Sequence, residues 1–199
     1  PGGDTSEPVS QATLRIVKVF WGLSSALAYR RHFPAIDWLR SYSLYEESMR
    51  EYFDVYIKKD WSSQVQKAME ILHEESQLEE IVRLVGIDSL EFQDRLTMEC
   101  ARSIREDFLH QIAFDEVDTY TSLNKQYGIL KAILSWYNFG QKGLKEHLNF
   151  SDIANMNVRE KIGRMKYIKE DDFEREYQEI INKINQEYKN LLAGDDFDG

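Results

Sequence analysis

Residues 78–120 read LEEIVRLVGIDSLEFQDRLTMECARSIREDFLHQIAFDEVDTY, and this stretch decides the fold. Its apolar residues recur at helical spacing on both sides of Gly86, which predicts two amphipathic helices joined by a turn. The predicted inner faces comprise Leu78, Ile81, Val82 and Val85 before the glycine, and Leu96, Cys100, Ile104 and Phe108 after it. Gly86 ends the first helix because glycine readily takes positive φ at a C-terminal cap. Asp88 or Ser89 can cap the second helix. Residues 86–94 are termed the tip and residues 111–118 the base, and we expect these two ends to serve different functions.

The composition is that of a soluble protein with a substantial core. The chain has 199 residues, of which 42% are hydrophobic, and a net charge of -10. This charge argues against a general binder of nucleic acid or of anionic membranes. No apolar run reaches the roughly 18 residues of a membrane span, and no signal peptide is visible. Cys100 is the only cysteine, so an internal disulfide is impossible and a cytoplasmic setting fits.

The front of the chain differs from the rest. It begins without Met, and all three prolines fall within the first 34 residues, so we expect the chain to be a piece of a longer protein. Residues 1–11 are predicted to form a loop, and residues 13–21 form the one good strand candidate. A single strand is unstable alone, which predicts that its partners lie outside the chain. Residues 23–29 are predicted to form one or two helical turns.

The back of the chain is predicted to be a helical bundle. An aromatic stripe over residues 42–56 has helical spacing and is expected to be core. A helix starting at Asp60 or Ser62 follows, and then the hairpin of residues 78–110. Leu123, Tyr127, Leu130, Leu134 and Tyr137 line a further helix, which we expect Gly140 and Gly143 to break. Short segments with Met156 and with Val158, Ile162 and Met165 precede a last helix from Asp171 or Asp172, and residues 193–199 are expected to be disordered.

Local motifs supply no catalytic apparatus. The pattern G-x-x-x-x-G-K-[ST] is absent, and so are G-x-S-x-G and a cysteine pair for zinc. His73 and Glu74 begin like a zinc motif, but Gln77 stands where the second ligand belongs. The four histidines are expected to be surface or packing residues. Asp115, Glu116 and Asp118 are a candidate cation site, although a solvated acidic cluster is the commoner explanation. Residues 28–39 (AYRRHFPAIDWL) are either a loop between elements or a site where an aromatic edge meets an anion or a base.

Several collinear segments resemble one family, the catalytic A subunit (alpha chain) of V-type and archaeal A-type rotary ATPases. They are PGGDTSEPV with TLRIVKVFWGL near the start, AYRRHFPAIDWL, RLVGIDSLEFQDRLTMECARSIREDFL, AFDEVDTY, and VREKIGRMKYI at 158–168. The resemblance implies a mainly α fold: the end of an α/β P-loop nucleotide-binding domain over residues 1–45, with one strand plus loops, and a C-terminal helical bundle over residues 46–199. The P-loop, the catalytic carboxylate and the Mg²⁺ ligands for ATP or ADP would precede Pro1. We therefore expect the chain alone to be catalytically inactive and to bind neither nucleotide nor metal.

The resemblance also implies two sites. Phe33 and Pro34 match a Phe-Pro pair that lines the adenine pocket, and Phe114 matches the aromatic residue that closes this pocket from the helical domain. Gln111 and Ala113 are weaker edge contacts. The alternative for Phe114 is plain core packing. Ile112 departs from the family pattern, where Asn is expected.

The tip matches the turn that faces the rotor, with Asp88, Ser89, Leu90, Glu91, Phe92 and Asp94 as its contact residues. Phe92 and Gln93 replace acidic residues of the F-type turn, which favours shape and apolar contact over charge. The implied partners are the B subunit in an alternating A3B3 ring and the central stalk, without nucleic acid and without membrane insertion. The expected location is cytoplasmic, on the soluble head of a complex that couples ATP synthesis or hydrolysis to ion transport. The alternative is a stand-alone helical interaction scaffold without a nucleotide role.

Overall fold

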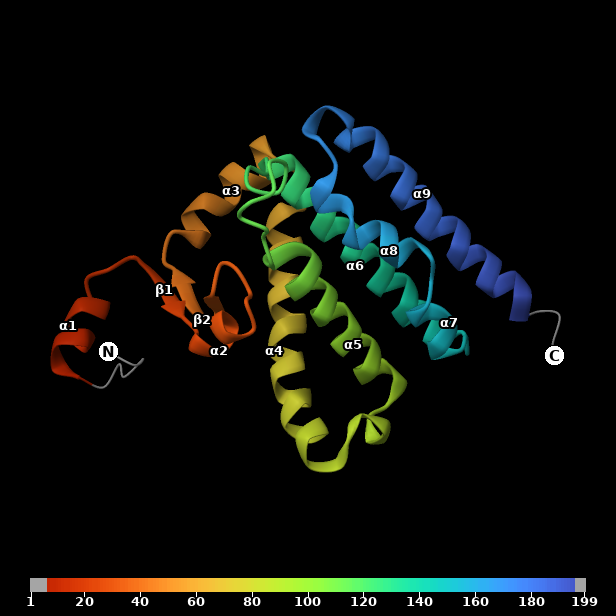
Figure 1. The fold of residues 1–199 in the computed structure, drawn as a ribbon, viewed down its shortest axis with the longest axis horizontal. Helices are drawn as coiled ribbons and strands as arrows, with labels where there is room; N and C mark the ends of the chain where they lie inside the picture. The colour runs from red at the N-terminus through yellow and green to blue at the C-terminus, as the bar shows by residue number, and fades with distance from the viewer. Residues whose placement is uncertain (1–6, 196–199) are drawn as a thin grey trace.

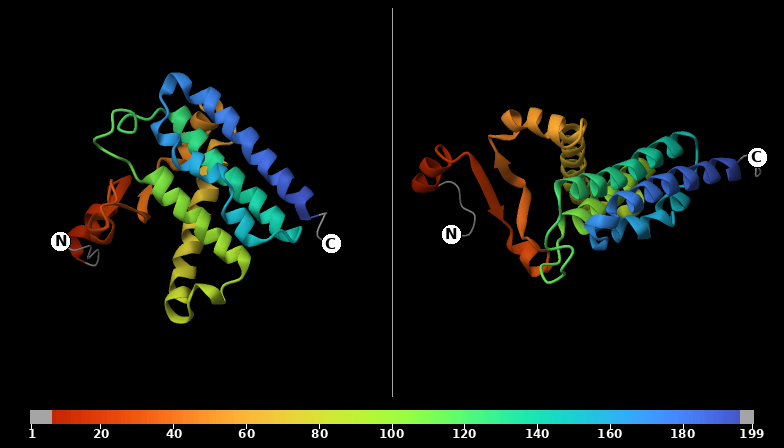
Figure 2. Two further views of the ribbon diagram at one scale, coloured as in Figure 1. Left: turned by 45° about the vertical axis from the view of Figure 1, so that its right-hand side comes forward. Right: turned by 90° about the horizontal axis from the view of Figure 1, so that it is seen from above.

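The structure is a computed structural model that describes residues 7–195. A small front part contains α1 (Pro8–Leu14), β1 (Val19–Leu23), α2 (Ser25–Tyr29) and β2 (Ile36–Ser43). The helical part contains α3 (Glu46–Tyr56), α4 (Trp61–Val85), η1 (Ile87–Ser89), α5 (Phe92–Ser103), η2 (Ile104–Leu109), α6 (Leu123–Lys145), α7 (Phe150–Ala154), α8 (Val158–Gly163), η3 (Met165–Tyr167) and α9 (Glu170–Asp195). The front part stands at one side of the bundle (Figures 1 and 2). The mainly α fold is as predicted.

The front part has more regular structure than predicted. The expected loop over residues 1–11 is wrong for residues 8–11, which lie in α1 with Pro8 at its start; residues 1–6 lie outside the described part. The expected strand over residues 13–21 begins only at Val19. Its partner is within the chain, because β1 pairs antiparallel with β2 in a two-stranded sheet. The helical turns expected over residues 23–29 are confirmed as α2.

The hairpin of α4 and α5 projects from the bundle (Figure 1). α4 begins after Asp60, as predicted, but it is one continuous helix of 25 residues, so the separate first helix predicted for the hairpin is wrong. α4 and α5 lie side by side and end together at the tip (Figure 1). Gly86 ends α4 with φ 85°, as predicted. The expected cap at Asp88 or Ser89 is wrong, because both lie in the 3-10 turn η1 and α5 begins after Glu91.

The two predicted inner faces of the hairpin differ in how far they are buried. On α5 and η2, Leu96, Cys100 and Ile104 are fully buried and Phe108 is half-buried, as predicted. On α4, only Leu78 of the predicted face is buried, whereas Ile81 and Val85 are exposed. The prediction fails there because α4 extends past the bundle, so its last turns have less of the molecule to pack against.

The glycines of α6 are packing residues. The predicted break at Gly140 and Gly143 is wrong, since α6 continues to Lys145. A Cβ at Gly140 would lie 2.9 Å from Leu96 Cδ2, and a Cβ at Gly128 would lie 2.6 Å from Phe173 Cε1. Both distances are shorter than carbon–carbon contact, so these glycines allow α5 and α9 to approach α6 closely.

We expect Gly128→Ala to destabilise the fold by about 1–3 kcal/mol, because the added methyl overlaps the buried ring of Phe173. The free energy of unfolding, measured with urea, checks this. The matched control is Gly194→Ala near the end of α9, where a Cβ would meet nothing within 4 Å and the change should be neutral or slightly stabilising. Equal stability of Gly128→Ala and the native protein would contradict the tight α6–α9 contact.

The core lies between α4, α5, α6 and α9, with α7, α8 and η3 closing one side. Val158, Ile162 and Met165 are buried, as predicted. On α9, Phe173, Ile184 and Tyr188 are buried. Residues 193–195, expected to be disordered, belong to α9, and residues 196–199 lie outside the described part.

The aromatic stripe before α4 is not core. Tyr45, Met49, Tyr52 and Tyr56 are all exposed, which corrects the prediction. α3 meets α4 through Phe53, whose ring stacks on Trp61 at 5.2 Å between centroids. Tyr45 and Met49 line an open pocket together with Trp61 and Val65 of α4. None of the described helices is both long and apolar enough to cross a membrane.

Candidate functional site

The base of the hairpin is hydrogen-bonded to the front part. The Gln111 backbone N–H donates to the Phe33 carbonyl oxygen at 2.7 Å. The peptide bond between Phe33 and Pro34 is cis. Pro34 and Gln111 also line one cavity of about 280 Å³, together with Asp107, Asp118, Gln126 and Lys166 among others. The two segments assigned to adenine are therefore adjacent, although Phe33 and Gln111 are 78 positions apart in the chain.

The key aromatic side chains are exposed at this junction. The Phe33 side chain is 50% exposed and the Phe114 side chain 100% exposed. Core packing, the alternative for Phe114, is therefore wrong in this structure. Ala113 is exposed as well, and the Gln111 side chain is engaged internally because its Nε2 donates to the Asp118 carbonyl oxygen at 2.8 Å. The rings of Phe33 and Phe114 remain available to a ligand.

The acidic residues of the base shape the loop. Asp118 is buried, and its Oδ2 accepts the Ile112 backbone N–H at 2.6 Å. Asp115 Oδ1 accepts the backbone N–H groups of Val117 and Asp118 at 2.9 and 2.8 Å. These bonds hold the loop in place, and Glu116 is exposed. Within residues 7–195, no group of three His, Cys, Asp or Glu residues is arranged to hold a metal ion.

His32 fastens the Phe33 segment to the end of the hairpin. Its Nε2 lies 3.0 Å from the Arg105 carbonyl oxygen, and its Nδ1 lies 3.2 Å from the Pro34 carbonyl oxygen. The neutral ring can donate through one nitrogen, and the imidazolium through both. His32 also stacks on His110 at 5.0 Å between centroids. Burial lowers the pKa of His110, and His32 and Lys166 nearby lower it further.

Arg105, at the end of the hairpin, connects η2 to α4. Its guanidinium donates to both oxygens of the Glu75 carboxylate, with Nη2 at 2.8 Å from Oε1. Burial raises the pKa of Glu75, and Arg105 offsets part of that rise. Arg105 lies on η2, which is a π-helix. At its end the His110 N–H donates to the Arg105 carbonyl oxygen, five residues earlier in the chain.

Two buried lysines complete the support of the base. Lys166 Nζ donates to the carbonyl oxygens of Glu106 and His110, each at 2.8 Å. Lys125 Nζ donates to the carbonyl oxygens of Lys166 and Ile168 at 2.8 and 2.6 Å. Burial lowers the pKa of both amines. The lysines connect α6, η3 and the end of η2 in series, and they satisfy carbonyls that helix ends leave unpaired.

Sequence reasoning did not assign these supporting residues. Lys125 precedes Ile129 by four positions and therefore lies on the buried face of α6. This spacing is visible in the sequence and could have indicated that Lys125 is buried. His32, Arg105 and Lys166 act through contacts with residues distant in sequence, and local spacing holds no sign of these.

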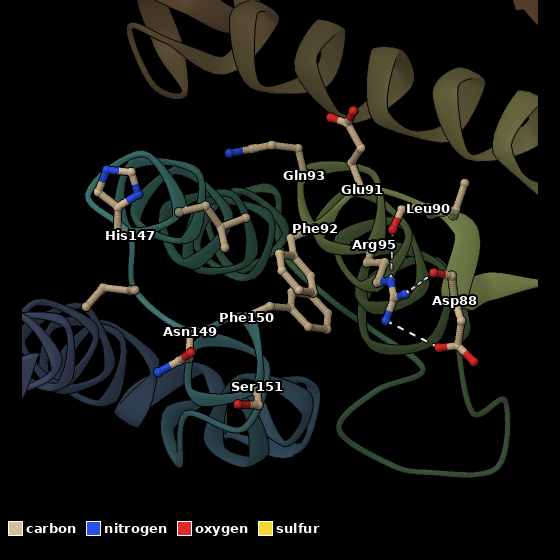
Figure 3. A pocket seen from close by; sticks show the side chains of 12 residues that line it. Asp88, Leu90, Glu91, Phe92, Gln93, Arg95, His147, Asn149, Phe150 and Ser151 are labelled. Atoms are coloured by element: carbon tan, nitrogen blue, oxygen red, sulfur yellow. Dashed lines mark hydrogen bonds and ion pairs between the residues drawn. The ribbon is translucent and has the colours of Figure 1, made fainter.

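A groove of about 920 Å³ lies beside the tip, between the start of α5 and the loop that joins α6 to α7 (Figure 3). The Phe92 ring stacks on Phe150 at 5.8 Å between centroids, and the Arg95 guanidinium lies 5.6 Å from the Phe92 centroid. Arg95 also donates to the Asp88 carbonyl oxygen at 2.7 Å and pairs with the Asp88 carboxylate at 3.4 Å. Arg95 thus organises the turn from within.

The predicted tip residues are not equally available. Leu90 is only 8% exposed and packs inward, while Asp88, Ser89, Glu91 and Phe92 are exposed and Asp94 is half-buried. Five apolar side chains on or beside the tip are each 46% or more exposed: Ile81, Leu84, Val85, Ile87 and Phe92. Leu84 is the most exposed of these at 84%. This set is termed the tip apolar surface.

Two protein families match the chain in sequence. The C-terminal domain of V and A type ATP synthase matches residues 50–153. The nucleotide-binding domain of the ATP synthase alpha/beta family matches residues 1–43.

Curated relatives match nearly the whole chain. V-type ATP synthase alpha chain from Acetivibrio thermocellus is 56% identical over 97% of this chain and 33% of its own length. The protein of that name from Clostridioides difficile is 55% identical over 96% of this chain and 32% of its own length. The chain therefore spans about a third of the length of these relatives.

Among solved structures, the ATP synthase subunit NeqB from Nanoarcheaum equitans aligns with a TM-score of 0.54 at 24% identity, over 69% of this chain and 32% of that one. At this identity the likeness concerns the fold alone. The match over residues 50–153 covers the hairpin, the base and all of α6, while Phe33 and Pro34 fall within the match over residues 1–43. The chain therefore belongs to the V- and A-type ATP synthase family, and its residues 50–153 are that family's C-terminal domain.

Proposed function

We propose that this chain is the C-terminal part of the catalytic subunit of a V/A-type rotary ATPase or ATP synthase. Residues 1–45 end the nucleotide-binding domain, and residues 46–199 form the helical domain. The relatives support this proposal because they match at least 96% of the chain and extend far beyond it. A stand-alone scaffold offers no reason for such similarity to a larger catalytic subunit. ATP or ADP with Mg²⁺ would bind the intact subunit, whereas the 199 residues lack a P-loop pattern and alone should turn over no ATP.

The helical domain closes the adenine pocket in this proposal. The observation that carries it is the hydrogen bond from Gln111 N–H to the Phe33 carbonyl, which brings the two segments together while Phe33 and Phe114 stay exposed. An adenine ring stacks on an aromatic face, and such stacking contributes about 1–3 kcal/mol per base. Pro34 and Ala113 would border the base, and Gln111 would position the loop.

Phe33→Ala in the intact subunit tests this assignment. We expect about tenfold weaker binding of ATP and ADP, because a stacking face is lost. Titration of a fluorescent adenine nucleotide measures the affinity. The matched control is Tyr29→Ala, since Tyr29 is an exposed aromatic residue of the same segment with no adenine role assigned. Unchanged affinity in Phe33→Ala would reject the pocket.

The hairpin then acts as a lever between pocket and rotor. The segment from Asp94 to His110 is about 25 Å long at about 1.5 Å per residue, so one rigid element joins the base to the tip. Closure of the pocket would move the tip against the central stalk, and rotor angle and nucleotide occupancy would be reciprocally coupled. The tip apolar surface supports a contact based on shape and apolar area, with the acids Asp88, Glu91 and Asp94 around it.

Leu84→Asp tests the rotor contact. We expect lower coupling of ATP hydrolysis to ion pumping in the assembled complex, with the stability of the subunit unchanged because the side chain is exposed. Ion transport per ATP hydrolysed is the measurement. Leu84→Met keeps an apolar side chain at the same position and should keep coupling. If Leu84→Asp couples as well as Leu84→Met, the tip apolar surface has no part in the contact.

The remaining assignments follow from the family. We propose that the partners are the B subunit in an A3B3 ring and the central stalk, with no role for nucleic acid or membrane insertion. The location is the cytoplasmic head of the complex, peripheral to the membrane. There the machine couples ATP synthesis or hydrolysis to ion transport.

A further inference from the structure

A second cavity, partly open to solvent, lies where strand β2 meets the bundle, and the lining surface that it exposes is apolar. Its volume is about 130 Å³. Trp38 contributes from β2, while the other lining side chains come from α4, from η2 and from α6. On the bundle side, Leu72, Ile104 and Leu130 are buried. The cavity is distinct from the one that Pro34 and Gln111 line.

The side-chain polar groups of Gln64, Gln126 and Tyr127, at the edge of the cavity, form hydrogen bonds with partners outside it. Gln64 Nε2 donates to Asp60 Oδ2 at 3.0 Å, and Gln126 Nε2 donates to the Thr121 carbonyl oxygen at 3.1 Å. The Tyr127 hydroxyl donates to Asp60 Oδ1 at 2.7 Å. These residues therefore present carbon to the cavity. A water molecule needs two to four polar partners, so this space favours an apolar occupant over water.

Size and lining specify the class of occupant. A cavity of about 150 Å³ lined by Leu, Ile and Phe side chains stays dry and binds benzene or xenon. Here Trp38, Trp61, Phe108 and Tyr127 bring four aromatic rings to the boundary. Rings pack well at offset or edge-to-face angles, which favours an aromatic guest over an aliphatic one of similar size. We propose that this cavity is a binding site for a small, neutral aromatic molecule about the size of benzene.

The site bridges the two parts of the chain. Trp38 also packs against His32, at 5.6 Å between ring centroids, and His32 fastens the Phe33 segment to Arg105. A guest between Trp38 and the bundle contacts both sides of this junction. It stabilises the arrangement that it binds by RT ln(1 + L/Kd), where L is the concentration of free guest.

Benzene itself is the probe, and binding to the full chain is measured without nucleotide, so the outcome is independent of the adenine assignment. We expect Tm to rise by about 2–4 °C, and to increase with the logarithm of benzene concentration once that concentration exceeds the Kd. Ala68→Leu places three more carbons in the cavity and should abolish the rise. Ile162→Val is the matched control: it removes one methyl from a buried position outside the cavity and should keep the full rise.

Crystals of the same chain under xenon pressure provide a second measurement, which does not depend on the variants folding. A xenon peak bounded by Trp38, Ala68 and Leu130 is expected. Absence of both a benzene-induced shift and this peak in the native protein would overturn the proposal. The proposal would also be overturned if folded Ala68→Leu showed the same benzene-induced rise in Tm as the native protein. Xenon bound only at sites outside this cavity would overturn it too.

Discussion

Phe114→Ala is expected to weaken the binding of ATP and ADP to the intact subunit about 10- to 100-fold. Phe114 is 100% exposed, so its whole ring face is open to the proposed contact with adenine and it contributes little to the fold. Loss of stacking with a base costs about 1–3 kcal/mol, and each 1.4 kcal/mol is a factor of ten in affinity. Equilibrium titration with a fluorescent adenine nucleotide measures the change, and thermal unfolding should show the same Tm as the native protein.

Tyr120→Ala is the matched control for this change. Tyr120 is aromatic and 82% exposed in the same loop, and it has no adenine role in the proposal. It should bind nucleotide as the native subunit does. Phe114→Tyr keeps the ring face and should restore most of the affinity. If Phe114→Ala and Tyr120→Ala bind nucleotide equally well, the helical domain does not close the pocket through this residue.

Periodicity predicted the elements whose packing is local. The face of Leu96, Cys100 and Ile104 is buried as its spacing requires, and Gly86 ends α4 because its φ of 85° is open to glycine. Gly140 was mispredicted for a tertiary reason: its missing side chain admits Leu96. The sequence shows a glycine in a helical pattern in both cases, and only the neighbouring helix distinguishes a packing position from a break.

Burial was the weaker prediction, because it depends on what lies against each face. Ile81 and Val85 repeat with helical spacing, yet they extend past the bundle and are exposed. Tyr52 and Tyr56 likewise have core spacing, yet they are exposed, because α3 contacts α4 through other residues such as Phe53 and Asp54. Apolar periodicity reports that a face is suited to burial, and in a subunit of an assembly that burial can come from another chain.

The junction between front and base was predicted by resemblance alone. Nothing in the spacing of residues 28–39 or 111–118 indicates that they meet, since the contact is nonlocal and rests on a single backbone hydrogen bond with side chains around it. The structure adds the side chains that hold it: His32 bonded to the Arg105 carbonyl, and Arg105 paired with Glu75. The adenine assignments therefore stand as proposals, now with a physical support that can be mutated separately from the aromatic rings.

Lys166→Met is expected to lower the free energy of unfolding by about 2–4 kcal/mol and also to weaken nucleotide binding. The Lys166 amine donates to the carbonyls of Glu106 and His110, and hydrogen bonds from a charged donor contribute about 1.5–3 kcal/mol each. Methionine fills similar space but leaves both carbonyls unpaired at the end of η2. Gln111 follows directly, so the loop that carries Phe114 loses its anchor. Urea denaturation and nucleotide titration measure the two effects.

Lys161→Met controls for the loss of one positive charge, because Lys161 is exposed on α8 and should tolerate the change. Phe114→Ala separates the two consequences of Lys166→Met: it should weaken binding without loss of stability, whereas Lys166→Met should impair both. In the double variant the binding losses should be less than additive, since both changes remove the same ring from the pocket. Fully additive losses would mean that Lys166 acts on nucleotide by another route than the position of Phe114.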